Sequence, residues 1–390
     1  MMLGFLLARA GIDVVVLEKH ADFLRDFRGD TIHPSTLEVM HELGILEILL
    51  KRPHQKLPQL RAQIGSTEVV MADFSRLPVQ CPFIALMPQW DFLNFLAEHA
   101  RRYSTFHLRT QAEVTGLIED GGRVVGVRAK TPGGALEVRA QLVVVADGRN
   151  SIIRERSGLQ VEDFGAPMDG LWFRLSRKPG ESATSLRFDR GKIVVMIDRG
   201  DYWQCAFLIP KGGNEETQRR GLERLRASIV EIAPFLQDRV SELQDWSEIK
   251  LLSVRVDRLR QWYRPGLLCI GDAAHAMSPI GGVGINLAIQ DAIAAANILA
   301  QPLREDAVTP DHLAKVQRRR ALATRLTQGF QLIIQKRLIA RVLATTERVE
   351  LPTPLRLMLR SKFLSRIRGR IVGIGFRPEH VKTPISNTGG

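Results

Sequence analysis

The sequence has few cysteines and no long uncharged apolar run. Its three cysteines, Cys81, Cys205 and Cys269, each lie in an apolar or strand-like run without a pairing pattern, so we expect buried thiols, no disulfide bonds and a reducing compartment. No apolar stretch approaches the length that spans a bilayer, and the first residues lack the basic region and cleavage pattern of a signal peptide. These absences predict a cytoplasmic protein.

Patterns typical of metal sites and of nucleophilic catalysis are also missing. The nine histidines are scattered without the spacing of metal ligands, and neither an H-E-x-x-H helix nor a nucleophile elbow occurs. We therefore expect no bound metal ion.

The composition, 45% hydrophobic and 6% aromatic over 390 residues, is that of a globular chain long enough for two domains.

Acidic residues are scarce in one segment, residues 315–370. The formal net charge of +13 lies in that segment, where 15 Lys or Arg accompany two acids, whereas 40 basic and 40 acidic residues balance elsewhere. A basic tail on a neutral body argues against nucleic-acid binding, which needs a basic patch on the folded core.

The start of the chain has the second half of a dinucleotide-binding unit without the first. Residues 3–10 predict a helix, Gly11 a stop, and residues 14–17 a buried strand that ends at Glu18. In a βαβ unit an acid at this place binds a ribose diol. Because the preceding strand and G-x-G-x-x-G loop are not in the sequence, we expect the main pyrophosphate cradle and one central strand to be missing.

Changes of pattern divide the chain into an α/β domain and an inserted sheet domain. We predict a Rossmann-like cofactor-binding domain, truncated at its first strand, in residues 1–164 and 256–310. Longer, half-polar strands in residues 165–255 predict an antiparallel substrate-binding sheet, and residues 311–390 a basic helical region. Within the first segment we expect a strand pair near 60–64 and 68–72.

The strongest motif spans residues 267–299. A buried strand runs into a loop and then a helix of small residues, and the notable positions are Gly271, Asp272, Pro279, Gly281, Gly282, Gly284 and Asn286. An acid at the carboxyl end of a strand can accept hydrogen bonds from sugar-like hydroxyls, and glycines allow a flat ligand to approach the backbone. Free N–H groups at the helix start favour negative charge. The alternative is an ordinary strand-to-helix turn.

Residues 271–292 match the form G-D-A-A-H-x-x-x-P-x-x-G-x-G-x-N-x-A-x-x-D-A at every fixed place. In this motif the sequence resembles the FAD-dependent aromatic hydroxylases related to p-hydroxybenzoate hydroxylase and the ubiquinone-pathway hydroxylases. The resemblance implies that Asp272 holds the ribityl chain and that the loop from Pro279 to Asn286 lies against the isoalloxazine.

A second motif, VVVADGRNSIIRERSGL, resembles the family's D-G-x-x-S-x-x-R through Asp147, Gly148, Ser151 and Arg154. The family uses it near the FAD pyrophosphate and the arriving NAD(P)H. Taken alone, Asp-Gly after a strand is most often a turn. Weaker matches complete the predicted cofactor set, and each has an ordinary structural alternative: Glu18 with Lys19, Arg28, Gln89 and Val114.

The resemblance implies a monooxygenase in which NADPH or NADH reduces FAD, O₂ forms a flavin C4a-hydroperoxide, and an aromatic or quinol-like substrate attacks it. Substrate contacts are expected from the inserted sheet, where an aromatic wall and a cation suit a phenolate or carboxylated ring, with Trp172, Arg174, Tyr202 and Trp203 as candidates. Sheet packing explains the same residues equally well. A prenyl-lipid reductase of the same fold and a non-catalytic protein unable to bind FAD remain alternatives, and the sequence does not set the oligomeric state.

Residues 353–370 predict a basic amphipathic helix with Leu355, Leu359, Phe363 and Ile367 on one stripe. Such a helix binds peripherally to an anionic membrane or packs on the flavin domain with a solvated basic face. Both interpretations remain open.

Overall fold

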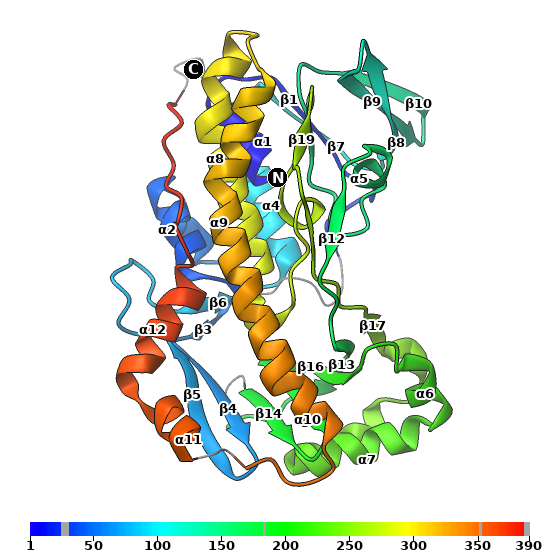
Figure 1. Cartoon of the computed structure of the whole chain (residues 1–390), viewed down its shortest axis with the longest axis vertical. Coiled ribbons are helices and arrows are strands. Elements are labelled where there is room, and N and C mark those ends of the chain that lie inside the picture. Colours follow the sequence, from blue (N-terminus) through cyan, green and yellow to red (C-terminus); the bar gives the residue numbers. More distant parts are fainter. Residues whose placement is uncertain (25–30, 182–184, 351–352, 386–390) are drawn as a thin grey trace.

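The computed structural model describes residues 1–24, 31–181, 185–350 and 353–385, and it leaves out the side chains of residues 354 and 355. Figure 1 shows an α/β body above a second sheet, with the long helix α9 (Pro310–Ile334) running along both. The predicted residue Arg28 lies outside the described residues. All three cysteines are buried and free, as predicted.

Parallel strands of the α/β body form two separate hydrogen-bonded sets. In one set β1 (Val14–Leu17) pairs with β7 (Phe106–Arg109), and in the other β11 (Val143–Val145) pairs with β20 (Leu267–Cys269), which β19 (Tyr263–Arg264) extends antiparallel. The second half of the predicted βαβ unit is confirmed, because α1 (Met2–Arg9) precedes β1.

The α/β body is completed by smaller sheets and helices. The predicted meander is β8 (Glu113–Asp120), β9 (Arg123–Thr131) and β10 (Gly134–Arg139); a three-stranded sheet holds β2 (Thr31–Ile32), β6 (Ile84–Leu86) and β3 (Gln55–Leu57); and β12 (Val161–Asp163) pairs with β18 (Asp257–Leu259). The helices are α2 (Pro34–Glu42), α3 (Leu46–Leu49), α4 (Gln89–Ala100), α5 (Ile152–Arg156) and α8 (Gly284–Arg304).

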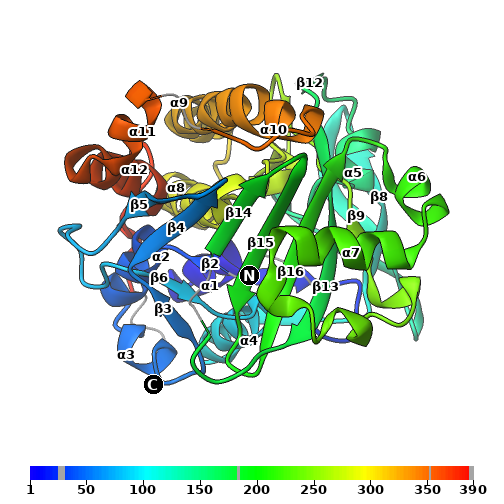
Figure 2. The ribbon, with the colours of Figure 1, turned by 90° about the horizontal axis from the view of Figure 1, so that it is seen from below.

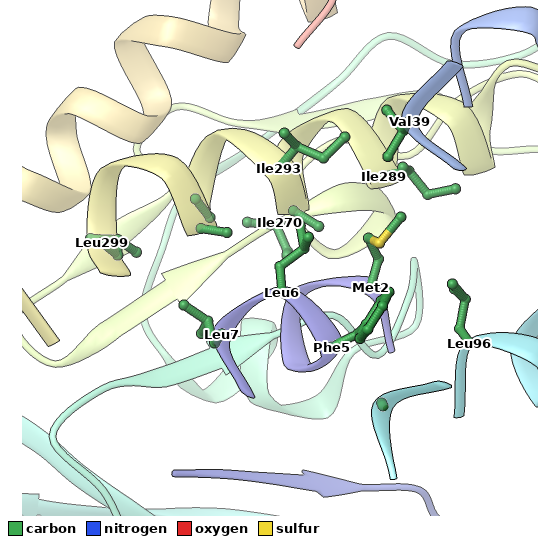
Figure 3. Packing of buried hydrophobic residues seen from close by; sticks show 14 of the residues in the cluster. Met2, Phe5, Leu6, Leu7, Val39, Leu96, Ile270, Ile289, Ile293 and Leu299 are labelled. Atoms are coloured by element: carbon green, nitrogen blue, oxygen red, sulfur yellow. The ribbon is translucent and has the colours of Figure 1, made fainter. Parts of the chain in front are cut away.

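The main core lies between α1, α4 and α8. In Figure 3 the side chains of Leu6 and Met2 point from α1 toward Ile293 and Ile289 of α8. Among the described helices, only the segment Ile280–Arg304 is long and apolar enough to cross a membrane by length and composition, and 72% of its apolar window is buried inside the protein. Although our sequence analysis expected no stretch of that length, the burial makes α8 a core helix.

The second sheet has seven strands in the order β17-β13-β16-β15-β14-β4-β5. Five come from the predicted inserted domain: β13 (Met168–Ser176), β14 (Ser185–Asp189), β15 (Lys192–Asp198), β16 (Tyr202–Pro210) and β17 (Lys250–Leu252). The other two, β4 (Gln59–Ile64) and β5 (Thr67–Asp73), form the predicted strand pair but belong to this sheet rather than to the first domain. The five strands from residues 165–255 pair antiparallel, as predicted. β4 adds to them in parallel with β14, so the complete seven-stranded sheet is mixed and includes two strands from outside that range.

Helices cover one face of this sheet. Residues from β13, β15 and β16 pack against α7 (Leu222–Ile232), which follows α6 (Asn214–Arg219), and Figure 2 shows α7 crossing the strands. Three short 3₁₀ turns, Pro234–Leu236, Val240–Glu242 and Trp246–Glu248, lead into β17. The opposite face of the sheet points toward the α/β body.

After α9 the chain continues through a π-helical turn (Gln335–Ile339), α10 (Ala340–Ala344), α11 (Thr353–Arg360) and α12 (Lys362–Gly373). The single helix predicted over 353–370 breaks at Ser361, whose Oγ accepts a hydrogen bond from the Leu364 N–H as the N-cap of α12. α12 packs on β5 of the second sheet, where the Arg368 guanidinium donates to the carbonyls of Met71 and Val70, and its last turn also contacts the α/β body through His33.

Candidate functional site

The site is built on strand ends, beginning with β1. The Glu18 N–H donates to the Arg109 carbonyl, the Ala112 N–H donates to the Glu18 carbonyl, and the Glu18 carboxylate accepts the N–H of His20, each at 2.9 Å. These bonds place Glu18 beside the start of β8, where Val114 packs on the core. Two residues predicted to serve the adenosine end of a cofactor therefore lie next to each other.

Asp147 follows β11. Desolvation raises the pKa of the Asp147 carboxyl, although Ser151, Arg154 and Lys19 act in the opposite direction. Gly148 has φ +90°, a conformation that L side chains rarely adopt, and a Cβ there would point into open space. The turn thus presents bare backbone next to Asp147.

An ion pair joins the two strongest motifs. Arg149 Nη2 lies 3.3 Å from Asp272 Oδ2, and both side chains are about a quarter exposed. The Asp272 carboxylate also lies at the start of α8, because a Cβ added to Gly284 would stand 3.7 Å from Oδ1. This side chain is therefore positioned between the Asp147 turn and the helix N-terminus.

Pro279 caps a 3₁₀ turn, Ile280–Gly282, that leads into α8. Gly281 and Gly282 both have positive φ, +78° and +64°, and a Cβ on Gly282 would stand 2.3 Å from Thr31 Oγ1. Thr31 Oγ1 donates to the Gly282 carbonyl at 2.9 Å. Glycine is required here because the loop is pressed against β2.

The Asn286 amide locks this loop to α2. Its Oδ1 accepts from the His33 N–H and from Thr36 Oγ1, and its Nδ2 donates to the carbonyls of Thr31 and Gly282. With 4% of its surface exposed, Asn286 positions the loop through its neighbours. His33 itself is buried, and desolvation lowers its pKa to about 4 against the raising effect of the Val372 and Gly281 carbonyls. It is neutral at neutral pH.

A buried charged network beneath the motif was not predicted. Asp291 accepts from the Gly271 N–H at 3.0 Å, from His275 Nε2 at 2.5 Å and from Arg320 Nε at 3.0 Å. Desolvation raises the pKa of Asp291, but His275 and Arg320 outweigh it and hold the pKa below its usual value. Asp291 is the acid in the motif's final D-A pair, so the sequence did offer a signal for this residue. Its partner Arg320 on α9 belongs to no local pattern that would predict it.

Arg154 has partners other than a cofactor. Its Nη1 lies 2.9 Å from Asp257 Oδ1, its Nη2 donates to the Arg149 carbonyl, and both charged side chains are buried. Arg154 therefore shapes the Asp147 turn from inside the protein. Gln89 is the first residue of α4, as its predicted place at a helix entry requires.

The four substrate candidates lie on two faces of the second sheet. Trp172, Arg174 and Tyr202 share the face toward the α/β body, where the Arg174 guanidinium lies 5.1 Å from the centre of the Tyr202 ring. Trp203 is buried on the face covered by α7, and its indole N–H donates to Glu181. Because side chains alternate along a strand, Tyr202 and Trp203 cannot both face the glycine loop of residues 279–286, which we call the flavin loop. Trp203 is therefore a packing residue.

Together these groups fit FAD. Acidic side chains at Glu18, Asp147 and Asp272 follow one another along the carboxyl ends of the parallel strands, as the hydroxyl-rich part of a dinucleotide requires. The open backbone at Gly148 and the glycine loop before α8 supply places for close approach of phosphate and ring. Among residues 1–24, 31–181, 185–350 and 353–385, no three His, Cys, Asp or Glu side chains cluster as metal ligands.

The fold and this line of groups define a flavoprotein of the FAD-binding α/β class. The chain belongs to the family described as "FAD binding domain", whose model matches residues 1–329. It is an FAD-dependent oxidoreductase of the aromatic hydroxylase type.

Two relatives illustrate the family. A 6-methylpretetramide 4-monooxygenase of Streptomyces rimosus is 32% identical over 344 residues, which are 86% of this chain and 81% of the relative. A para-nitrophenol 4-monooxygenase of Pseudomonas sp. (strain WBC-3) is 26% identical over 78% of this chain and 75% of its own length. The crystal structure of pqsL, a probable FAD-dependent monooxygenase from Pseudomonas aeruginosa, shares the fold: its TM-score is 0.72 at 23% identity, over 88% of this chain and 94% of that one.

Proposed function

We propose that the protein uses NADPH or NADH and O₂ to hydroxylate an aromatic or otherwise electron-rich small molecule. The observation that supports the proposal is that Trp172, Arg174 and Tyr202 share one face of the second sheet. Ile280 of the flavin loop packs against an apolar cluster that contains Leu208 and Met168 on the same face. The names of the two monooxygenase relatives support an aromatic substrate.

In this proposal the strand ends hold FAD. Glu18 accepts hydrogen bonds from the ribose, Asp272 from the ribityl chain, and the N–H groups at the start of α8 favour the anionic reduced ring. Bound FAD would supply the redox chemistry, which is hydride uptake from the nicotinamide and transfer of one oxygen atom of O₂ to the substrate while the other oxygen atom leaves as water.

The sheet face orients the substrate ring. Trp172 packs against a cluster that contains buried apolar residues of β3 and β6, and Val372 and Ile374 at the end of α12 pack against the same cluster. The Arg174 guanidinium supplies a cation that suits a phenolate or a ring carboxylate. An aromatic wall that carries a cation therefore favours a planar anionic ring over a neutral polar compound.

Mass spectrometry of products tests the reaction. The FAD-loaded protein should oxidise NADPH or NADH in the presence of a suitable phenol or quinol, and the product should gain one oxygen atom. A gain of two hydrogens would identify a reductase instead. Failure to retain the flavin absorption bands after desalting would support a non-catalytic protein.

Substitution of Arg174 tests whether the substrate binds at this face of the sheet. Arg174→Gln should raise KM for a carboxylated or phenolate substrate at least tenfold, because it removes the cation, while FAD retention stays unchanged. Arg128→Gln, on the exposed meander strand β9, is the matched control and should change neither quantity. An unchanged KM in Arg174→Gln would exclude this face as the anion-binding wall. The predicted cytoplasmic location and peripheral membrane contact are also proposals.

A further inference from the structure

The outer side of α11 and α12 exposes an unusual number of large apolar side chains. Leu357 is 64% and Phe363 69% exposed, and Met358 and Ile367 are exposed as well. Single exposed apolar residues are normal on proteins, but four within eleven residues form a patch that water solvates poorly. Phe363 and Ile367 are four residues apart and therefore share one face of α12.

Basic side chains surround these residues, and acids are absent from the segment. Residues 353–373 contain six Arg or Lys and no Asp or Glu, and four of the basic residues are exposed: Arg356, Arg360, Lys362 and Arg370. Among the described residues, none of these four forms an ion pair with a carboxylate. The surface therefore combines apolar area with uncompensated positive charge.

The same combination continues along α9. Leu322, Leu326 and Ile333 of α9 are exposed at helical spacing, exposed Arg325 lies between them, and exposed Lys336 and Arg337 follow in the π-helical turn after α9. Figures 1 and 2 show α9, α11 and α12 along the same outer side of the molecule. We call the exposed apolar and basic residues named in this and the two preceding paragraphs the basic-apolar face.

The contacts of α12 with the body fix which side points outward. Arg368 is bound to the carbonyls of β5, and a Cβ on Gly369 would stand 2.0 Å from the Asp73 carbonyl oxygen, so this side of the helix is pressed on the sheet. At the far end of α12, the Val372 carbonyl accepts a hydrogen bond from His33 Nδ1 at 2.8 Å. The helix thus runs from the exposed patch to the edge of the flavin loop.

Charge decides between the possible occupants. A second copy of this chain in a two-fold dimer would bring the face against itself and place its arginines together. An acidic protein would neutralise the charge, but its acidic surface would leave the exposed Leu357 and Phe363 side chains without an apolar phase to enter. An anionic bilayer satisfies both features, since headgroup phosphates bind Arg and Lys while Leu and Phe enter the acyl boundary.

We propose that the basic-apolar face docks the protein peripherally on an anionic lipid membrane. The candidate membrane-spanning segment is the buried core helix α8, so the contact is with the membrane surface. Docking does not depend on the proposed reaction. If both hold, a lipophilic ring compound reaches the substrate face along α12 without crossing bulk water.

Vesicle flotation of the FAD-loaded protein tests the proposal. We expect binding to phosphatidylcholine vesicles that contain phosphatidylglycerol, at least a tenfold loss in high salt, and little binding to phosphatidylcholine alone. Leu357→Ser with Phe363→Ser should weaken binding at any salt concentration, and Arg356→Gln with Arg360→Gln should weaken it at least tenfold at low salt. Leu251→Ser with Arg101→Gln changes one exposed apolar and one exposed basic residue elsewhere and should have no effect.

Each contrary outcome identifies another occupant or none. Equal binding by the variants and the wild type, or no binding to anionic vesicles, would overturn the proposal. A concentration-dependent dimer that Phe363→Ser abolishes would assign the face to a second copy, and salt-sensitive retention on polyglutamate without vesicle binding would assign it to an acidic protein. Thermal unfolding and flavin retention of every variant show that the fold is intact.

Discussion

Arg149 and Asp272 form an ion pair, Nη2 to Oδ2 at 3.3 Å, that links the turn after β11 to the loop before α8. The two residues are far apart in sequence, yet each lies inside one of the motifs that indicated FAD. The pair therefore joins the two motifs of the candidate cofactor site across the carboxyl ends of adjacent strands.

Asp272→Ala should weaken FAD binding by ten- to a hundredfold, because one charge-assisted hydrogen bond contributes about 1.5–3 kcal/mol. Titration of the apoprotein with FAD, followed by flavin fluorescence, measures the change in Kd. Asp120→Ala, at the exposed β8–β9 turn, is the control and should bind FAD like the wild type. Equal Kd values for the two variants would remove Asp272 from the cofactor site.

Gly282→Ala should destabilise the protein by about 1–3 kcal/mol, because the new Cβ collides with Thr31 and the residue keeps a positive φ. Gly329→Ala on α9 meets no atom within 4 Å and should be neutral or stabilise by up to about 1 kcal/mol. Urea unfolding measures both free energies. A Gly282→Ala protein as stable as the wild type would show that the loop does not press on β2.

His33 should make stability depend on pH. Its folded pKa of about 4 lies below the ordinary value of 6.5, so its contribution is complete above pH 6.5 and is lost as pH falls toward 4. The loss amounts to about 3 kcal/mol for the full shift. His33→Asn retains a donor for the Val372 carbonyl but does not titrate. The unfolding free energy of the wild type should therefore fall relative to that of His33→Asn between pH 6.5 and 4.5. Parallel plots of unfolding free energy against pH for the two proteins would contradict the burial of a neutral His33 ring.

Arg320→Met should cost about 3–5 kcal/mol, because it leaves the buried Asp291 carboxylate without its arginine partner. Arg318→Met lies on the same helix but removes only an exposed pair with Asp311, and its unfolding curve should nearly overlay that of the wild type. Comparable losses of unfolding free energy in both variants would show that α9 tolerates neither substitution. The loss in Arg320→Met could then not be assigned to the buried network.

Local patterns in the sequence predicted much of the fold. The helix, glycine stop and strand before Glu18, the helix entry at Gln89 and the strand–loop–helix at 267–299 all depend on contacts between near neighbours, and the structure confirms each of them. Pairing between distant strands leaves no such local pattern. For that reason the sequence predicted β4 and β5 as a strand pair but did not predict the pairing of β4 with β14.

The same distinction applies to the site. Motif spacing located Asp147, Asp272 and the glycine loop, but it did not separate residues that face a ligand from residues that hold the loop in place. Arg154 and Asn286 belong to the second kind, because their polar atoms are bonded to buried protein groups. Likewise, a strand pattern does not tell which face meets which neighbour, so Trp203 was grouped with Tyr202.

The parallel pairing of β14 with β4 also has a consequence for biosynthesis. On the ribosome the hairpin β4–β5 emerges long before β14, and until then the edge of β4 that later receives β14 is open. The nascent chain must keep this edge from pairing with other chains until β14 has been made. Residues 165–255, excised as a separate unit, would expose the matching edge of β14, so this region is a poor module for transplantation into another enzyme.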